Sequence, residues 1–153
     1  MRISTLAAIA VLSGSAAAAQ DIYAGVGFDF GNPSSGDSQT VASLMIGSSF
    51  DAGSMTIGIE GEYGAAATFG GDYDTARLRL LGGFDMDGFT AIGSVGSTQH
   101  STNAGKVNGY NLGVGVQVPV NSALNVRGEI LHDVMEGSAA NATTSRIAAI
   151  YSF

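Results

Sequence analysis

The 153-residue chain contains no cysteine, no tryptophan and only two prolines. Without cysteine, neither a disulfide framework nor a cysteine-ligated metal site can form. Charged residues make up only 12% of the chain, and Lys and Arg together number 6 against 13 Asp and Glu. The formal net charge of −7 argues against nucleic-acid binding, because phosphate backbones are held by clusters of lysine and arginine.

The chain also lacks any apolar segment of the roughly 20 residues that a membrane-spanning helix requires. A shorter apolar run lies near the N-terminus, after Arg2, and ends in the small residues Ala17, Ala18 and Ala19. This order of basic, apolar and A-x-A residues is typical of a cleaved secretory signal peptide, the alternative being a retained anchor. We therefore expect residues 1–19 to be a signal peptide and residues 20–153 to form one secreted domain.

What the chain has instead is regular alternation of apolar with polar or small residues. A period of two is typical of strands whose two faces meet different surroundings, and no segment follows the helical period. Eight segments show it, at 21–30, 40–50, 54–63, 73–84, 89–98, 108–118, 124–134 and 144–153. Strands of about ten residues with alternating hydrophobicity are the signature of an outer-membrane β-barrel. The predicted fold class is all-β, an eight-stranded antiparallel up-and-down transmembrane barrel.

The connections between these segments alternate in length. Longer polar connections are expected at 31–39, 64–72, 99–107 and 135–143, and tight turns at 51–53, 85–88 and 119–123. Outer-membrane barrels have short periplasmic turns and longer outer loops. Both ends of the barrel domain are therefore expected on the periplasmic side.

Aromatic residues on the apolar face gather near the strand ends. Phe50, Phe84, Phe89, Tyr151 and Phe153 fall at the expected periplasmic rim, and Phe28, Phe30, Tyr63 and Tyr110 at the opposite rim. Two aromatic girdles at the two interfaces are typical of these barrels. The pattern predicts that the apolar face contacts lipid.

The other face carries charges. An arginine facing lipid at the bilayer midplane costs about 2–4 kcal/mol, so this face must point into the barrel. Antiparallel pairing brings Glu60 and Glu62 beside Arg77 and Arg79, and Arg146 towards both Glu129 and Asp29. The full set is Asp29, Glu60, Glu62, Arg77, Arg79, Arg127, Glu129, Asp133 and Arg146. Because an eight-stranded barrel has room only for side chains, we expect these charges to pair and to plug the lumen.

The final strand adds a resemblance to a known family. Ile147, Ala149, Tyr151 and Phe153 alternate on its apolar face. With this ending, the chain after the signal peptide resembles the small eight-stranded outer-membrane barrels of the OmpA, OmpX and opacity-protein type (porin-like superfamily). The resemblance implies a monomer in the outer membrane, in contact with its lipid and lipopolysaccharide. It also implies that the barrel-assembly machinery reads these four residues as an assembly signal.

One stretch leaves an enzymatic alternative open. His100-Ser-Thr-Asn-Ala-Gly105 resembles a sequence found in barrels that deacylate lipid A, but Thr102 stands where the nucleophilic serine would be. No orienting acid follows at a suitable distance, and a triad requires one. His100 is therefore expected to be a solvated loop residue, and His132 an interface residue at the outer rim. We expect no catalytic residue, cofactor or metal.

A third alternative is a soluble, lipocalin-like barrel that binds a small apolar ligand. It would have the same alternation with the apolar face turned inward. Alternation alone does not say which face points inward, whereas the rim aromatics and the charged face favour the membrane protein.

Overall fold

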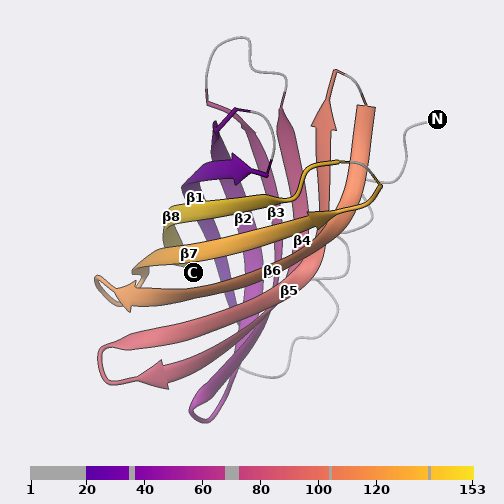
Figure 1. Ribbon diagram of the computed structural model, residues 1–153. Coiled ribbons are helices and arrows are strands. Elements are labelled where there is room, and N and C mark those ends of the chain that lie inside the picture. Colours follow the sequence, from indigo (N-terminus) through magenta and orange to yellow (C-terminus); the bar gives the residue numbers. More distant parts are fainter. Residues whose placement is uncertain (1–19, 35–36, 68–72, 104, 138) are drawn as a thin grey trace, which may run out of the picture.

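The computed structural model describes residues 20–34, 37–67, 73–103, 105–137 and 139–153, so the expected signal peptide lies outside the described residues. Eight strands make up the fold: β1 (Gln20–Pro33), β2 (Gln39–Ala52), β3 (Met55–Ala66), β4 (Asp74–Met86), β5 (Phe89–Thr102), β6 (Gly105–Pro119), β7 (Leu124–Met135) and β8 (Ala142–Ser152). Each strand pairs antiparallel with its sequence neighbours, and β8 pairs with β1, which closes the barrel (Figure 1). The predicted fold class is confirmed. No helix in the described segments is long and apolar enough to cross a membrane.

The apolar face of nearly every strand points away from the barrel axis. Along β8 buried and exposed residues alternate, and large apolar side chains such as Leu44 and Val114 are 64% and 66% exposed. A continuous apolar surface of this kind is unfavourable in water but is what lipid-facing strands present. The alternative of a soluble barrel with its apolar face inward is therefore wrong.

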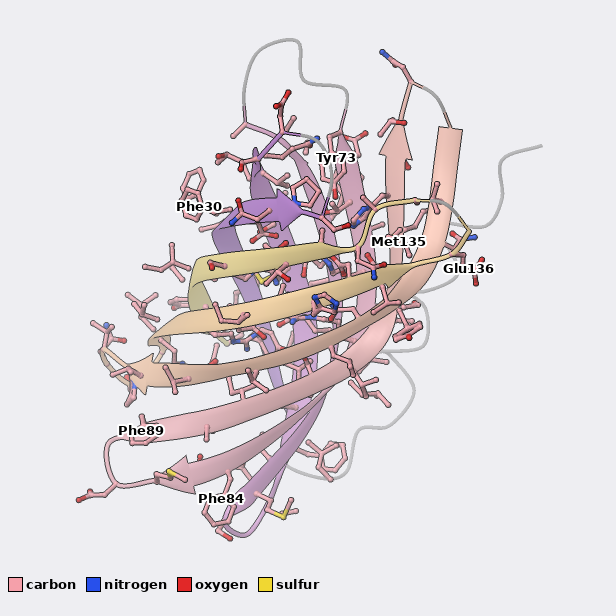
Figure 2. The ribbon with its side chains drawn as sticks, viewed as in Figure 1. Phe30, Tyr73, Phe84, Phe89, Met135 and Glu136 are labelled. Carbon is pink, nitrogen blue, oxygen red and sulfur yellow. The ribbon has the colours of Figure 1, made fainter. Side chains whose placement is uncertain are left out.

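The exposed aromatic side chains lie towards the two ends of the strands. Figure 2 shows Phe84 and Phe89 at one end of the barrel and Phe30 at the other. All nine expected girdle residues are exposed on the outer surface: Phe28, Phe30, Phe50, Tyr63, Phe84, Phe89, Tyr110, Tyr151 and Phe153. The barrel thus has an aromatic-bordered apolar belt around its outside.

The tight turns expected at 51–53 and 85–88 are confirmed. The β2–β3 turn contains Gly53 and the β4–β5 turn contains Gly88, with positive φ angles of 79° and 88° that favour glycine. Both hairpins have the same threonine-to-aspartate side-chain hydrogen bond beside the turn. Thr56 Oγ1 donates to Asp51 Oδ1 at 3.1 Å, and Thr90 Oγ1 donates to Asp85 Oδ1 at 2.8 Å.

The opposite end differs from the expectation, because the strands continue further than predicted. The connection expected at 99–107 is much shorter, since β5 runs to Thr102 and β6 begins at Gly105. Polar cross-strand contacts accompany this extension, such as Gln99 Nε2 donating to Asn108 Oδ1 at 2.8 Å. Strand residues beyond the lipid have no need of an apolar face, so their polar composition resembles that of a loop.

Candidate functional site

The most distinctive feature of the lumen is its set of buried charges, which we term the interior charge network. It comprises the nine residues expected from the sequence: Asp29, Glu60, Glu62, Arg77, Arg79, Arg127, Glu129, Asp133 and Arg146. All nine point into the barrel, and none is more than 6% exposed. Charges so fully removed from water require ionic and hydrogen-bonding partners.

Part of the interior charge network lies towards the end with the β3–β4 and β7–β8 connections. Arg146 Nε donates to Asp29 Oδ1 at 2.6 Å, and its Nη1 donates to Glu62 Oε2 at 2.7 Å. Arg77 shares Glu62 and reaches across the lumen to Asp133, with 2.7 Å between Nη2 and Oδ2. Two arginines and three carboxylates are thus joined by bonds that cross the barrel.

A second part lies closer to the tight turns and is centred on Glu60. This carboxylate accepts from Arg79, from Arg127 Nη1 at 2.6 Å and from the Tyr23 hydroxyl at 2.9 Å. Arg79 also donates to both oxygens of Glu129, at 2.9 and 3.1 Å. Paired donors of this kind exploit the planar fork of the guanidinium group.

The two parts form one network. Arg146 Nη1 lies 3.7 Å from Glu129 Oε2, and Arg79 Nε lies 3.9 Å from Glu62 Oε2. The register explains the shortest links, because Glu60 pairs with Arg79, Glu62 with Arg77 and Asp29 with Arg146 on adjacent strands. Links between β7 and either β3 or β4, such as Arg127 with Glu60, depend on closure of the whole barrel.

His100 is not the solvated loop residue expected from the sequence. It lies on β5, is only 9% exposed and points into the lumen. Its Nε2 lies 3.4 Å from Asp133 Oδ2, and its Nδ1 lies 2.8 Å from the Tyr73 hydroxyl. The alternation of β5 extends from Thr98 to His100, so following it two residues further would have placed this histidine correctly.

Tyr23 is a second luminal residue that the sequence reading missed. Its ring lies against Gly47 on the neighbouring strand, and the Arg127 guanidinium carbon is 5.6 Å from the ring centroid. Tyr23 has the same strand parity as Asp29 and could have been found on that basis. Its sequence neighbours Ile22 and Ala24 belong to the apolar outer face.

The four expected assembly-signal residues and His132 lie outside the lumen. Ile147, Ala149, Tyr151 and Phe153 are exposed on the outer surface, where the rings of Tyr151 and Phe153 meet edge to face. His132 is also exposed, with its Nδ1 2.9 Å from Thr143 Oγ1. Ile147, Ala149, Tyr151 and Phe153 form a continuous apolar stripe along β8 and the residue after it.

Beneath the interior charge network, on the tight-turn side, the lumen opens into a cavity of about 610 Å³, which we term the vestibule. Its deeper walls are Tyr23, Leu81, Ile92, Arg127 and Ile150. Polar residues from several strands line its mouth: Asp21, Asp51, Thr56, Thr90, Asn125 and Ser152. The buried charges therefore lie in the middle of the lumen, and a cavity lies at its tight-turn end.

The sequence matches the family described as the outer membrane protein beta-barrel domain over residues 4–153. The chain belongs to this family. No curated protein matches it by sequence. The protein is therefore an outer-membrane β-barrel, with its apolar belt in lipid.

Solved structures of small outer-membrane proteins share the fold of this barrel. Neisserial surface protein A is 10% identical with a TM-score of 0.61, covering 88% of this chain and 97% of its own. Ail, the attachment invasion locus protein of Yersinia pestis, is also 10% identical, with a TM-score of 0.63 and the same coverage. The N-terminal barrel domain of Pseudomonas aeruginosa OprF is 8% identical with a TM-score of 0.65, covering 86% of this chain and 97% of its own. At these identities the similarity concerns the fold alone.

Membership of the outer-membrane barrel family supplies an orientation. Short turns face the periplasm in these proteins. Three of the four connections at the opposite end are longer, namely those between β1 and β2, β3 and β4, and β7 and β8. The β2–β3, β4–β5 and β6–β7 turns, and with them the vestibule, then lie on the periplasmic side. Tyr73 and His100 lie towards the cell exterior.

Proposed function

We propose that this outer-membrane barrel is closed by its interior charge network, and that its role is structural or one of surface interaction. The observation that carries the proposal is Arg79, whose side chain is fully buried in the lumen and paired with Glu60 and Glu129 from two other strands. A guanidinium bonded to carboxylates of two other strands spans the lumen at that level and favours a closed barrel.

Energetics favour a network that stays closed. Removing one partner from a buried ion pair costs about 3–5 kcal/mol, because the other charge is left unpaired in a medium that solvates it poorly. Each arginine of the network contacts at least two carboxylates among the described residues. Opening a path for ions would therefore break several such contacts at once.

The experiment is a proteoliposome permeability assay. The Arg79→Ala and Glu129→Ala double variant removes an ion pair without changing net charge, and we expect it to admit small ions that the wild-type barrel excludes. Leu80→Ala is the matched control, because Leu80 neighbours Arg79 but faces lipid. Rapid ion entry through the wild-type barrel would show that the charges do not seal it.

The surface role concerns outer-membrane lipid and lipopolysaccharide, which we propose the monomer contacts through its girdles after insertion by the barrel-assembly machinery. The outer rim is acidic, with Asp37, Asp74 and Glu136 against the single exposed cation Lys106 among the described residues. Ail has been crystallised with the heparin analogue sucrose octasulfate. The opposite charge at this rim favours cationic or cation-bridged partners here rather than sulfated ones.

We propose that the barrel does not modify lipid A. The Asp133 carboxylate accepts hydrogen bonds from Arg77 and Asn111, so it is not a dedicated orienting partner of His100. The hydroxyl nearest to His100 is Tyr73, which lies before β4; burial raises the pKa of that phenol, as do the Asp133 and Asp29 carboxylates. A phenol so disposed is a poor nucleophile at neutral pH. Lipid A from cells with His100→Ala should match the wild type by mass spectrometry, and a lost modification would reverse this conclusion.

A further inference from the structure

The vestibule is an empty cavity with opposite charges at its two ends. A closed barrel does not need such a cavity. Small interior residues create the space, namely Ser49 on β2, Gly58 on β3 and Gly83 on β4. Further along the same strands, the interior positions hold Glu60 and Arg79 instead. A volume of about 610 Å³ lies within the range of small-molecule binding sites.

The inner end of the vestibule presents hydrogen-bond donors. Arg127 lines it and is only 3% exposed. Its Nε donates to Gln117 Oε1 at 3.0 Å and its Nη1 to Glu60 Oε2 at 2.6 Å, and the Tyr23 ring lies over the guanidinium group. A guanidinium has five N–H donors in a planar fork that suits a carboxylate. The buried Arg127 guanidinium can therefore donate hydrogen bonds to a carboxylate that enters the vestibule.

The outer end of the vestibule has the opposite charge. Asp21 on β1 and Asp51 on β2 line it, and no lysine or arginine other than Arg127 lines the cavity among the described residues. Leu81, Ile92 and Ile150 contribute apolar wall between the two ends. A ligand that satisfies all three parts has a carboxylate, a small or apolar body and an ammonium group, in that order along the barrel axis.

Strand geometry sets the distance between the two charged ends. The Arg127 guanidinium carbon is 5.6 Å from the centroid of Tyr23, and Asp21 is two residues from Tyr23, or about 7 Å along the strand. Asp21 pairs with Ser49, so Asp51 lies roughly another 7 Å towards the mouth. A span of about 7–14 Å matches an extended peptide of roughly two to four residues, at ~3.5 Å each.

We propose that the vestibule binds short zwitterionic peptides with small or apolar side chains. The C-terminal carboxylate pairs with Arg127 and Gln117, and the N-terminal ammonium lies between Asp21 and Asp51. The periplasmic opening makes the site accessible to peptides of that compartment. This binding is independent of whether the interior charge network ever conducts ions.

The test uses the barrel in lipid nanodiscs, titrated with Ala-Ala-Ala and followed by saturation-transfer NMR of the peptide methyl groups. We expect saturable binding, weakened roughly tenfold either by N-acetylation or by C-terminal amidation, since each removes one charge-assisted contact. The Asp21→Asn and Asp51→Asn double variant should weaken Ala-Ala-Ala to a similar degree. The same variant should leave the N-acetylated peptide unchanged, which a general loss of structure would not do.

A second variant tests whether peptide binding requires the empty volume of the vestibule. Ser49→Phe should fill the vestibule and abolish binding while the barrel keeps the gel-mobility shift on heating that marks a folded barrel. Absence of saturable binding by wild-type protein would overturn the proposal. So would equal affinity for the doubly capped peptide, or for hexanoate, which has the carboxylate and the apolar body but lacks the ammonium group.

Discussion

At the residue scale, the lumen shows why arginine rather than lysine is the buried cation. Arg79 and Arg146 each contact carboxylates from two or more strands, and such sharing uses the several donors of one guanidinium group. Strand parity was enough to predict which side chains enter the lumen. It was not enough to predict that Arg77 meets Asp133, because that contact crosses the barrel and depends on how the sheet closes.

The first prediction at this scale concerns coupling between Glu60 and Arg79. Arg79→Gln alone should lower the free energy of unfolding by about 3–5 kcal/mol, because it leaves Glu60 and Glu129 short of a counter-ion. Glu60→Gln combined with Arg79→Gln should be less destabilising than the sum, with a coupling energy of roughly 1–3 kcal/mol. Urea unfolding in lipid vesicles measures all three variants. Strict additivity would mean that the two side chains do not interact.

The second prediction concerns Gly47, over which the Tyr23 ring lies. A Cβ at this position would lie 2.3 Å from Tyr23 Cζ, so Gly47→Ala should displace the ring and destabilise the barrel by about 1–3 kcal/mol. Tyr23→Leu in the same chain should recover part of that loss. Gly82→Ala is the matched control, since a Cβ there meets no atom within 4 Å, and its cost should be small. Equal effects of Gly47→Ala and Gly82→Ala would rule out the clash.

At the scale of the element, the strand centres were predictable and their outer ends were not. The apolar alternation that identifies a strand disappears where the strand leaves the lipid, although the backbone ladder continues. For β5 and β6 this continuation replaces an expected nine-residue loop by a turn and brings His100 into the lumen. Polar composition indicates contact with water, and the residues of a water-exposed hairpin are as polar as those of a loop.

Hydrogen exchange tests this extension directly. Interstrand hydrogen bonds should slow amide exchange in the ladder from His100 to Ser101, because the paired strands continue to Thr102 and Gly105. Ser122, exposed in the β6–β7 turn, serves as the internal reference and should exchange faster. Uniformly fast exchange from residue 99 to residue 107 would restore the loop that the sequence suggested.

At the scale of the whole molecule, the barrel is inverted relative to a water-soluble protein. Its apolar side chains face outward, its charges are buried, and its stability depends on lipid covering the belt. The sequence already indicated this arrangement. The strands alternate strictly, so if the apolar face contacts lipid, the charges on the other face must lie inside the barrel. The vestibule was not predictable, since an empty volume depends on the sizes of side chains from several strands together.

Leu80→Arg tests the placement of the belt. Leu80 is 58% exposed on the outer face of β4, in the middle of the strand, and an arginine there should cost about 2–4 kcal/mol of unfolding free energy in vesicles. Val120→Arg is the control, because Val120 is comparably exposed but lies in the β6–β7 turn, where the cost should be close to zero. Equal costs at the two positions would place the belt elsewhere.

Single-channel recording of the purified wild-type protein in a planar lipid bilayer tests most directly whether the buried charges seal the barrel. We expect the inserted barrel to show no steady ionic conductance, and Arg79→Ala with Glu129→Ala to introduce defined conductance steps. A stable open-channel current through the wild-type barrel would contradict this expectation.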